Sequence, residues 1–143
     1  MMNIQLLYTL HGLLQEIAFL VLFPIGIIIA LCKLYIGSKW FILHILFQTV
    51  GIVCVISAVL IMAYAKYLEK PTNKSSRKSI PLHVYIGIAI VILILFQVVW
   101  AVLMRDKIDR NIWTRIHIIL ASIILILGWT NLYLGYKLYK NRF

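Results

Sequence analysis

The chain has few charged residues, and very few of those are acidic. Aspartate and glutamate together number 4, against 14 lysines and arginines, and charged residues make up 13% of the 143 positions. A soluble domain would carry about twice that fraction. Because 64% of the residues are hydrophobic, the composition argues against a soluble protein. The shortage of carboxylates also argues against a carboxylate-rich metal site.

Cysteine is equally scarce. The only two, Cys32 and Cys54, form no CxxC motif, so the sequence predicts neither a disulfide framework nor a zinc site. The net charge of +10 does not indicate nucleic-acid binding, because the basic residues form no face of a folded soluble unit. We expect it to contact anionic lipid headgroups instead. Aromatic residues such as Trp40, Trp100 and Trp113 lie near the ends of apolar runs, which is typical of membrane interfaces.

What the sequence does contain is four long apolar runs. Between Lys33 and Lys66 only Lys39 is charged. No charged residue occurs between Lys78 and Arg105. Runs of this length indicate transmembrane helices, and short connections make neighbouring helices antiparallel. We therefore predict an all-α, multi-pass integral membrane protein of unassigned compartment. It should form one domain over residues 1–143, a four-helix up-down bundle with helices at roughly 4–34, 40–67, 81–104 and 112–138.

Other features refine this outline. The N-terminus lacks the basic region of a cleavable signal peptide, so the first run is expected to be a retained helix. Pro24-x-Gly26 predicts a kink in its second half. The polar stretch at 69–79 predicts a solvated loop, with Pro81 in the first turn of the third helix. Glu16 is the one acid inside an apolar run; a proton-linked group and a polar pairing are both open readings.

One histidine lies near the start of each apolar run, and the chain has no others: His11, His44, His83 and His117. Because successive helices alternate in direction, we expect His11 and His83 near one surface and the other two near the opposite one. The layers would lie roughly 20 Å apart, about 14 residues of helical rise. Polar residues in lipid are usually functional, and imidazole is a common axial ligand of haem iron. The pattern predicts two haem b groups, ligated by His11 with His83 and by His44 with His117. They would be non-covalent because there is no CxxCH.

Three amides accompany the histidines. Gln48 follows the second histidine by one turn, while Gln97 and Asn131 follow the third and fourth by 14 positions. Gln97 should therefore lie near the second haem and Asn131 near the first. We expect these amides to bind the haems, through propionates or the outer imidazole nitrogens, or else to hydrogen-bond between helices. Small residues on the histidine faces leave room for a macrocycle or for close helix packing: Gly51, Gly87 and Ala121.

Taken in order, these fragments resemble the cytochrome b561 family, especially the haem core that follows DOMON domains in ferric-reductase-like members. The fragments are His11-Gly12, Pro24-Ile25-Gly26, Trp40-Phe41-x-x-His44-x-x-x-Gln48, His83-x-x-x-Gly87, Gln97, Trp113-x-x-x-His117 and Asn131-x-x-x-Gly135. The resemblance covers almost the whole chain, without a DOMON domain. It implies a transmembrane oxidoreductase in which ascorbate, or a similar one-electron donor, reduces one haem. The other haem would reduce monodehydroascorbate or a ferric chelate. Lys33 stands near the family's usual arginine, so the ascorbate site stays open.

The expected partners are the lipid bilayer and separate redox partners. The sequence has no GxGxxG and no P-loop, so electrons should come from a small-molecule donor or a redox protein and leave to a similar acceptor. A homodimer is one possible assembly. The alternative function is a haem-bearing or structural membrane subunit of a larger respiratory or quinone-linked complex.

Overall fold

The computed structural model describes residues 3–69 and 80–143. Within these residues it is helical and contains no strand. Almost all of the predicted polar loop at 69–79 lies outside the described residues. The helical elements are α1 (Ile4–Glu16), the π-helix η1 (Ile17–Leu22), α2 (Phe23–Leu31), α3 (Lys33–Ile36), the 3-10 helix η2 (Gly37–Lys39), α4 (Trp40–Leu68), α5 (Leu82–Leu103) and α6 (Arg110–Lys140).

Four stretches are long and apolar enough to cross a membrane: Ile4–Leu31, Lys33–Leu68, Leu82–Leu103 and Arg110–Lys140. Their mean hydropathies lie between 2.0 and 2.9. Large apolar side chains along them are exposed, including Leu20 at 57%, Leu60 at 64% and Ile92 at 60%. A bilayer would cover these side chains, since lipid is as apolar as they are. The predicted class, an all-α multi-pass membrane protein, is confirmed.

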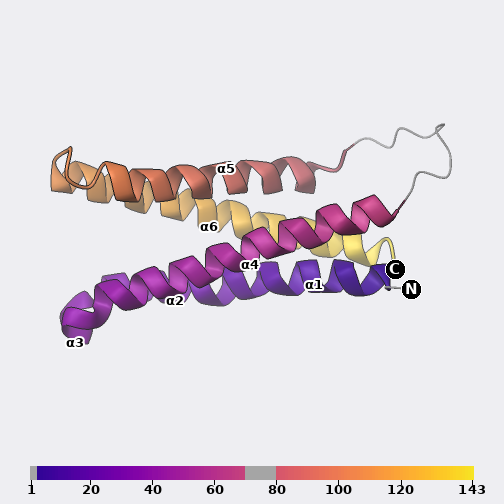
Figure 1. The fold of residues 1–143 in the computed structure, drawn as a ribbon, viewed down its shortest axis with the longest axis horizontal. Coiled ribbons are helices and arrows are strands. Elements are labelled where there is room, and N and C mark those ends of the chain that lie inside the picture. Colours follow the sequence, from indigo (N-terminus) through magenta and orange to yellow (C-terminus); the bar gives the residue numbers. More distant parts are fainter. Residues whose placement is uncertain (1–2, 70–79) are drawn as a thin grey trace. The chain divides into compact units, whose positions relative to one another are not determined.

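The chain divides into two compact units, which we describe separately. The first is Met1–Ser79 with Gly135–Phe143, and the second is Ile80–Leu134. In the first unit the α1, η1 and α2 elements lie antiparallel along α4 (Figure 1). In the second unit α5 lies antiparallel along α6, because residues late in α5 contact residues early in α6 and the reverse. Each unit is therefore an antiparallel pair of spans.

The first span changes its helical winding midway. The backbone N–H of Phe23 bonds to the carbonyl of Ala18, five residues earlier, at the end of the π-helical η1. Pro24 follows directly, and proline lacks the N–H that an α-helix needs while its ring crowds the preceding turn. A wider π-helical turn is a common solution to such a conflict. A π-helical segment thus lies just before the proline, and the kink at Pro24-x-Gly26 stays a prediction.

Small residues bring the two spans of the first unit together. Ala18 and Ala58 are 0% exposed. Phe19 and Phe23 contact each other edge-on, with ring centroids 5.1 Å apart. The ring of Phe23 lies against the backbone of Gly51 on α4. The interior of this unit is thus a close contact between α2 and α4 in which one aromatic ring fills the space over a glycine.

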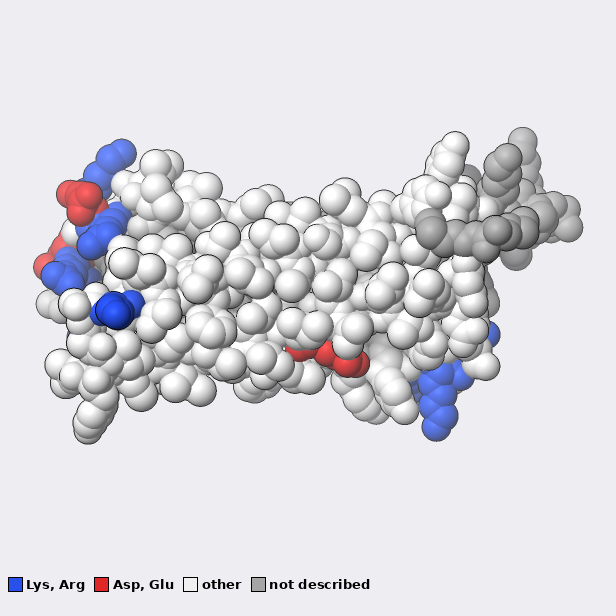
Figure 2. Space-filling view, turned by 60° about the horizontal axis from the view of Figure 1, so that its bottom comes forward, with Lys and Arg blue, Asp and Glu red and all other residues white. Residues whose placement is uncertain are grey.

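A polar cluster ties the C-terminus of the chain into the first unit. The hydroxyl of Tyr8 donates to the Glu69 carboxylate at 3.1 Å. Lys66 and Arg142 both pair with the same carboxylate, and the Arg142 guanidinium lies 4.4 Å from the centroid of the Tyr8 ring. In Figure 2 the blue atoms lie near the helix ends, and the surface between them is white apart from one red group. The cluster therefore lies near the ends of the helices, at the edge of the apolar part of the span.

Glu16 is the exception to this charge distribution. It lies 12 residues after the start of the first span and 15 before its end, and it is exposed beside Leu13 and Leu20, themselves 48% and 57% exposed. We expect Glu16→Leu to favour insertion of the span by about 3 kcal/mol, because a charged residue at a helix centre opposes insertion by that amount. A glycosylation assay of membrane insertion measures this. Gln5→Leu, near the end of the span, should change insertion much less; equal effects would contradict the mid-membrane placement.

Candidate functional site

His11 is held by the backbone of the neighbouring span. Its Nδ1 lies 2.9 Å from the carbonyl oxygen of Ala58 on α4. A carbonyl oxygen only accepts hydrogen bonds, so the imidazole must donate from Nδ1. The ring is thereby fixed in the tautomer whose lone pair lies on Nε2. That is the tautomer in which Nε2 is able to bind a metal.

His44 is held in the same way, but here the histidine is on α4 and the carbonyl is on the first span. It lies in the second turn of α4 and donates from Nδ1 to the carbonyl oxygen of Gly26 on α2 at 2.7 Å. One turn further on, the Gln48 amide donates to the carbonyl oxygen of Phe23 at 3.2 Å. Gln48 therefore hydrogen-bonds between helices, the alternative that the sequence left open. A contact between Gln48 and haem stays a prediction.

His83 repeats the arrangement in the second unit. Its Nδ1 lies 3.0 Å from the backbone carbonyl oxygen of Asn131 on α6. The side-chain amide of Asn131 lies in van der Waals range of the position that a β-carbon on Gly87 would take. Among the described residues, Asn131 Oδ1 is buried without a hydrogen-bond partner. Asn131 thus lies beside His83, where the 14-residue spacing placed it, and its main chain makes the contact.

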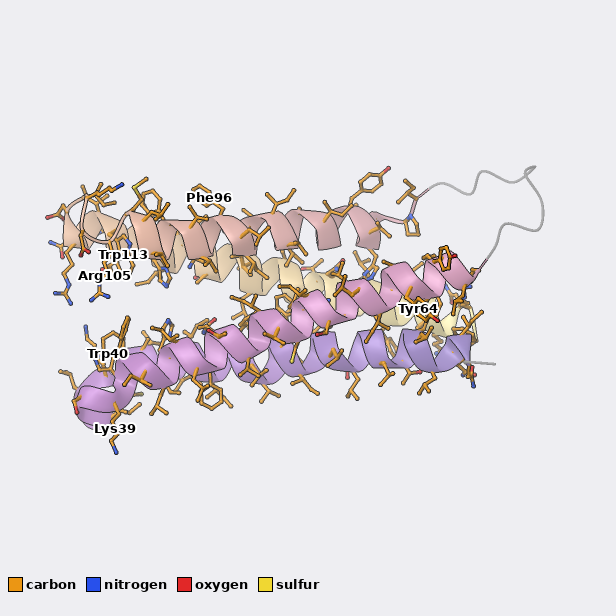
Figure 3. All side chains as sticks on the ribbon, in the orientation of Figure 1. Lys39, Trp40, Tyr64, Phe96, Arg105 and Trp113 are labelled. Atoms are coloured by element: carbon orange, nitrogen blue, oxygen red, sulfur yellow. The ribbon has the colours of Figure 1, made fainter. Side chains whose placement is uncertain are left out.

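His117 has a different partner. Its Nδ1 faces the side-chain amide nitrogen of Gln97 on α5 at 3.1 Å, and the same nitrogen donates to the His117 carbonyl oxygen at 2.9 Å. Trp113 stacks on the imidazole, with centroids 5.1 Å apart and planes 8° from parallel. The Trp113 indole N–H donates to the Trp100 carbonyl at 3.4 Å. Figure 3 shows Trp113 and Arg105 at the end of this unit where α5 and α6 are joined.

The interpretation of Trp113 as an interfacial aromatic missed this contact. A spacing of four residues puts two side chains on the same face of a helix, so the interval from Trp113 to His117 was a readable signal. The carbonyl partners of the other three histidines are backbone atoms, and no residue type marks them. For Gly51, where macrocycle space and helix packing were both open, the Phe23 ring lies 2.5 Å from a β-carbon position. The packing interpretation therefore fits at that glycine.

Both units place their histidines at two levels. On α4, His44 lies 14 residues before Ala58, whose carbonyl bonds to His11. On α6, His117 lies 14 residues before Asn131, whose carbonyl bonds to His83. In an α-helix this corresponds to about 21 Å. No group of three or more potential metal-ligating side chains occurs among the described residues. The donor set fits haem, whose macrocycle supplies four ligands and needs only axial imidazoles.

Comparison with known sequences decides the family. A model of the eukaryotic cytochrome b561 family matches residues 10–141. The chain belongs to the cytochrome b561 family. Two relatives from Arabidopsis thaliana are each described as a cytochrome b561 and DOMON domain-containing protein. The first is 31% identical over 132 residues, which cover 90% of this chain and 31% of the relative. The second is 28% identical over 135 residues, which cover 93% of this chain and 32% of the relative.

The chain thus spans about a third of the length of these relatives. No solved structure matches it significantly. The family match and the four apolar stretches make this chain an integral multi-pass membrane protein of a family that binds haem b. The resemblance predicted from the ordered fragments is confirmed.

Proposed function

We propose that this cytochrome b561 chain binds two haem b groups and passes single electrons between the two faces of the membrane. His11 and His83 are the axial ligands of one haem, and His44 and His117 are those of the other. The donor is ascorbate or a similar one-electron reductant. The acceptor on the opposite face is monodehydroascorbate or a ferric chelate.

The observation that carries this proposal is the two-level placement of the histidines within each unit. Two imidazoles about 21 Å apart along one helix pair are too distant to share an iron atom. In this proposal each haem takes its second axial ligand from the other unit, and the equal spacing of the two levels within each unit supports the pairing of His11 with His83 and of His44 with His117. Two haems near opposite faces suit electron transfer through a membrane, because each is close to its own aqueous reactant.

The protein's residues prepare the ligands. Bound haem b supplies an iron that alternates between the ferric and ferrous states. Ala58, Gly26 and Asn131 each offer a backbone carbonyl that holds one imidazole with its lone pair on Nε2. These acceptors are backbone carbonyls within helices and cannot rotate as a side chain can. The orientation of the three imidazole rings is therefore fixed.

Electron transfer across a sealed membrane tests the function directly. The purified chain would be reconstituted into vesicles that contain ferric citrate, and ascorbate would be added outside. We expect two b-type haems per chain in a pyridine haemochrome assay, and reduction of the enclosed ferric citrate. Vesicles with His83→Ala should show only the leak rate. Tyr85→Ala serves as the control, because that side chain is 56% exposed.

Other outcomes separate the alternatives. Two haems that are reduced by a quinol but not by ascorbate would favour a quinone-linked subunit of a larger complex and contradict the proposed donor. A folded chain without haem would overturn electron transfer by this protein and favour a structural subunit. One haem per chain would contradict the two-haem path.

A further inference from the structure

His117 differs from the other three histidines in the atom that faces its Nδ1. The other three face carbonyl oxygens, which only accept hydrogen bonds. His117 faces the amide nitrogen of Gln97 at 3.1 Å, and an amide nitrogen only donates. In this arrangement Nδ1 accepts, so the proton of the neutral ring lies on Nε2. That tautomer is the wrong one for ligation through Nε2.

The second contact of Gln97 shows why its orientation matters. The amide nitrogen has two hydrogens, one for Nδ1 and one for the His117 carbonyl oxygen at 2.9 Å. The amide oxygen of Gln97 is meanwhile buried without a hydrogen-bond partner among the described residues. A buried polar atom without a partner is unfavourable by about 1–3 kcal/mol. The side chain thus satisfies the ring and the main chain of His117 but leaves its own oxygen unsatisfied.

Rotation of the Gln97 amide by half a turn exchanges these roles. The oxygen then faces Nδ1 and accepts a hydrogen bond from it, so the ring proton lies on Nδ1 and the lone pair on Nε2. The same oxygen comes to lie near the His117 carbonyl oxygen, at the place where the nitrogen is 2.9 Å away, and two acceptors repel each other. The hydrogen bond from His117 is therefore weaker than those that the other histidines donate to carbonyls.

We propose that Gln97 is a positioning residue that sets the tautomer of His117 and, through it, the reduction potential of the haem that His117 ligates. This inference rests on the proposed ligand role of His117. A weaker bond from Nδ1 leaves the imidazole less electron-rich, and such a ligand favours the ferrous state. The weak bond from His117 accordingly raises the potential of the haem that it ligates above the value that a carbonyl partner would give.

Two substitutions at Gln97 should shift this potential in opposite directions. Gln97→Glu places an acceptor-only group at Nδ1, which makes the imidazole more basic and lowers the potential. Gln97→Met removes the amide, so that its oxygen can no longer accept a hydrogen bond from Nδ1, and this raises the potential. We expect the Glu variant to change the ferric-to-ferrous preference at least tenfold, or about 59 mV for a one-electron couple. The potential of the other haem should stay as it is.

Gln48→Glu separates the effect of charge from that of the hydrogen bond. It places the same carboxylate one turn from His44, the proposed partner ligand of His117, where the present amide bonds to Phe23 and not to an imidazole. Redox titration and a haem count would be made on the same full-length samples in lipid nanodiscs. Opposite shifts at one haem, with a smaller effect of Gln48→Glu, would support the inference.

Two results would overturn it while leaving the proposed function intact. One is a two-haem protein in which neither Gln97 variant moves a potential. The other is an equal fall of potential in the two Glu variants, which charge alone explains. A folded wild-type chain without two haems would instead contradict the proposed function, and this inference with it. If the Glu variant does not accumulate, a fall of potential in Gln97→Met is sufficient to reject the proposal.

Discussion

The His83→Ala protein is expected to contain one haem per chain instead of the two proposed for the wild type. Removal of the imidazole takes away one axial ligand and leaves the Asn131 carbonyl without the Nδ1 donor that lies 3.0 Å from it. His117 lies about 21 Å from Asn131 along α6, and it forms with His44 the proposed ligand pair of the second haem, so that haem should remain. The measurement is a pyridine haemochrome assay with protein quantified in the same sample, together with reduced-minus-oxidised spectra.

The other three histidines turn this result into a test of the pairing. His11→Ala should lose the same spectral component as His83→Ala, and the double variant should lose no more than either single one. His44→Ala and His117→Ala should each lose the other component. If His83→Ala and His44→Ala removed the same component, the proposed pairing would be wrong. Circular dichroism of each variant distinguishes loss of a haem from loss of the fold.

Most of the architecture was predictable because hydrophobicity marks membrane spans directly. Long apolar runs with few charged residues predicted four helices, and the structure places their ends within a few residues of the expected positions. The second span, for example, ends at Leu68 where residue 67 was predicted. The π-helical η1 was not predictable, because every residue of Ile17–Leu22 is an ordinary helix former in lipid. Only the proline that follows signals it, and a proline is compatible with several distortions.

The candidate site was predictable in its side chains and not in its backbone. Four histidines in an apolar sequence stand out because each is unfavourable in lipid without a role. Gln97 was placed beside His117 by counting along antiparallel helices, and the structure has it there. The Gly26 and Ala58 carbonyls carry no sequence signature, since every residue has a carbonyl. Which helix face meets which carbonyl depends on the packing angle of the helices, which composition does not determine.

Gly51→Ala is expected to destabilise the first unit and weaken the hold on His44. A β-carbon there would lie 2.5 and 2.8 Å from two atoms of the Phe23 ring. Phe23 is only 6% exposed and contacts Phe19, so the ring has little room to turn. Overpacking of this kind usually destabilises by about 1–3 kcal/mol. Separation of α2 from α4 would also lengthen the 2.7 Å bond from His44 to Gly26.

Alanine substitutions at two other glycines serve as controls for Gly51→Ala. A methyl group at Gly26 meets mainly the end of the Gln48 side chain, which is flexible, so Gly26→Ala should destabilise less than Gly51→Ala. At Gly12 nothing lies within 4 Å of the added atom, so Gly12→Ala should leave the His44 haem unchanged.

The compensating change is Phe23→Leu, which shortens the side chain that the new methyl group meets. We expect Phe23→Leu to restore both stability and haem content when combined with Gly51→Ala, although alone it leaves a void in the same contact. Thermal melting in detergent and haem content per chain measure the four members of this cycle. Strictly additive effects would mean that Gly51 and Phe23 do not interact. The close approach of α2 to α4 would then not be what positions His44.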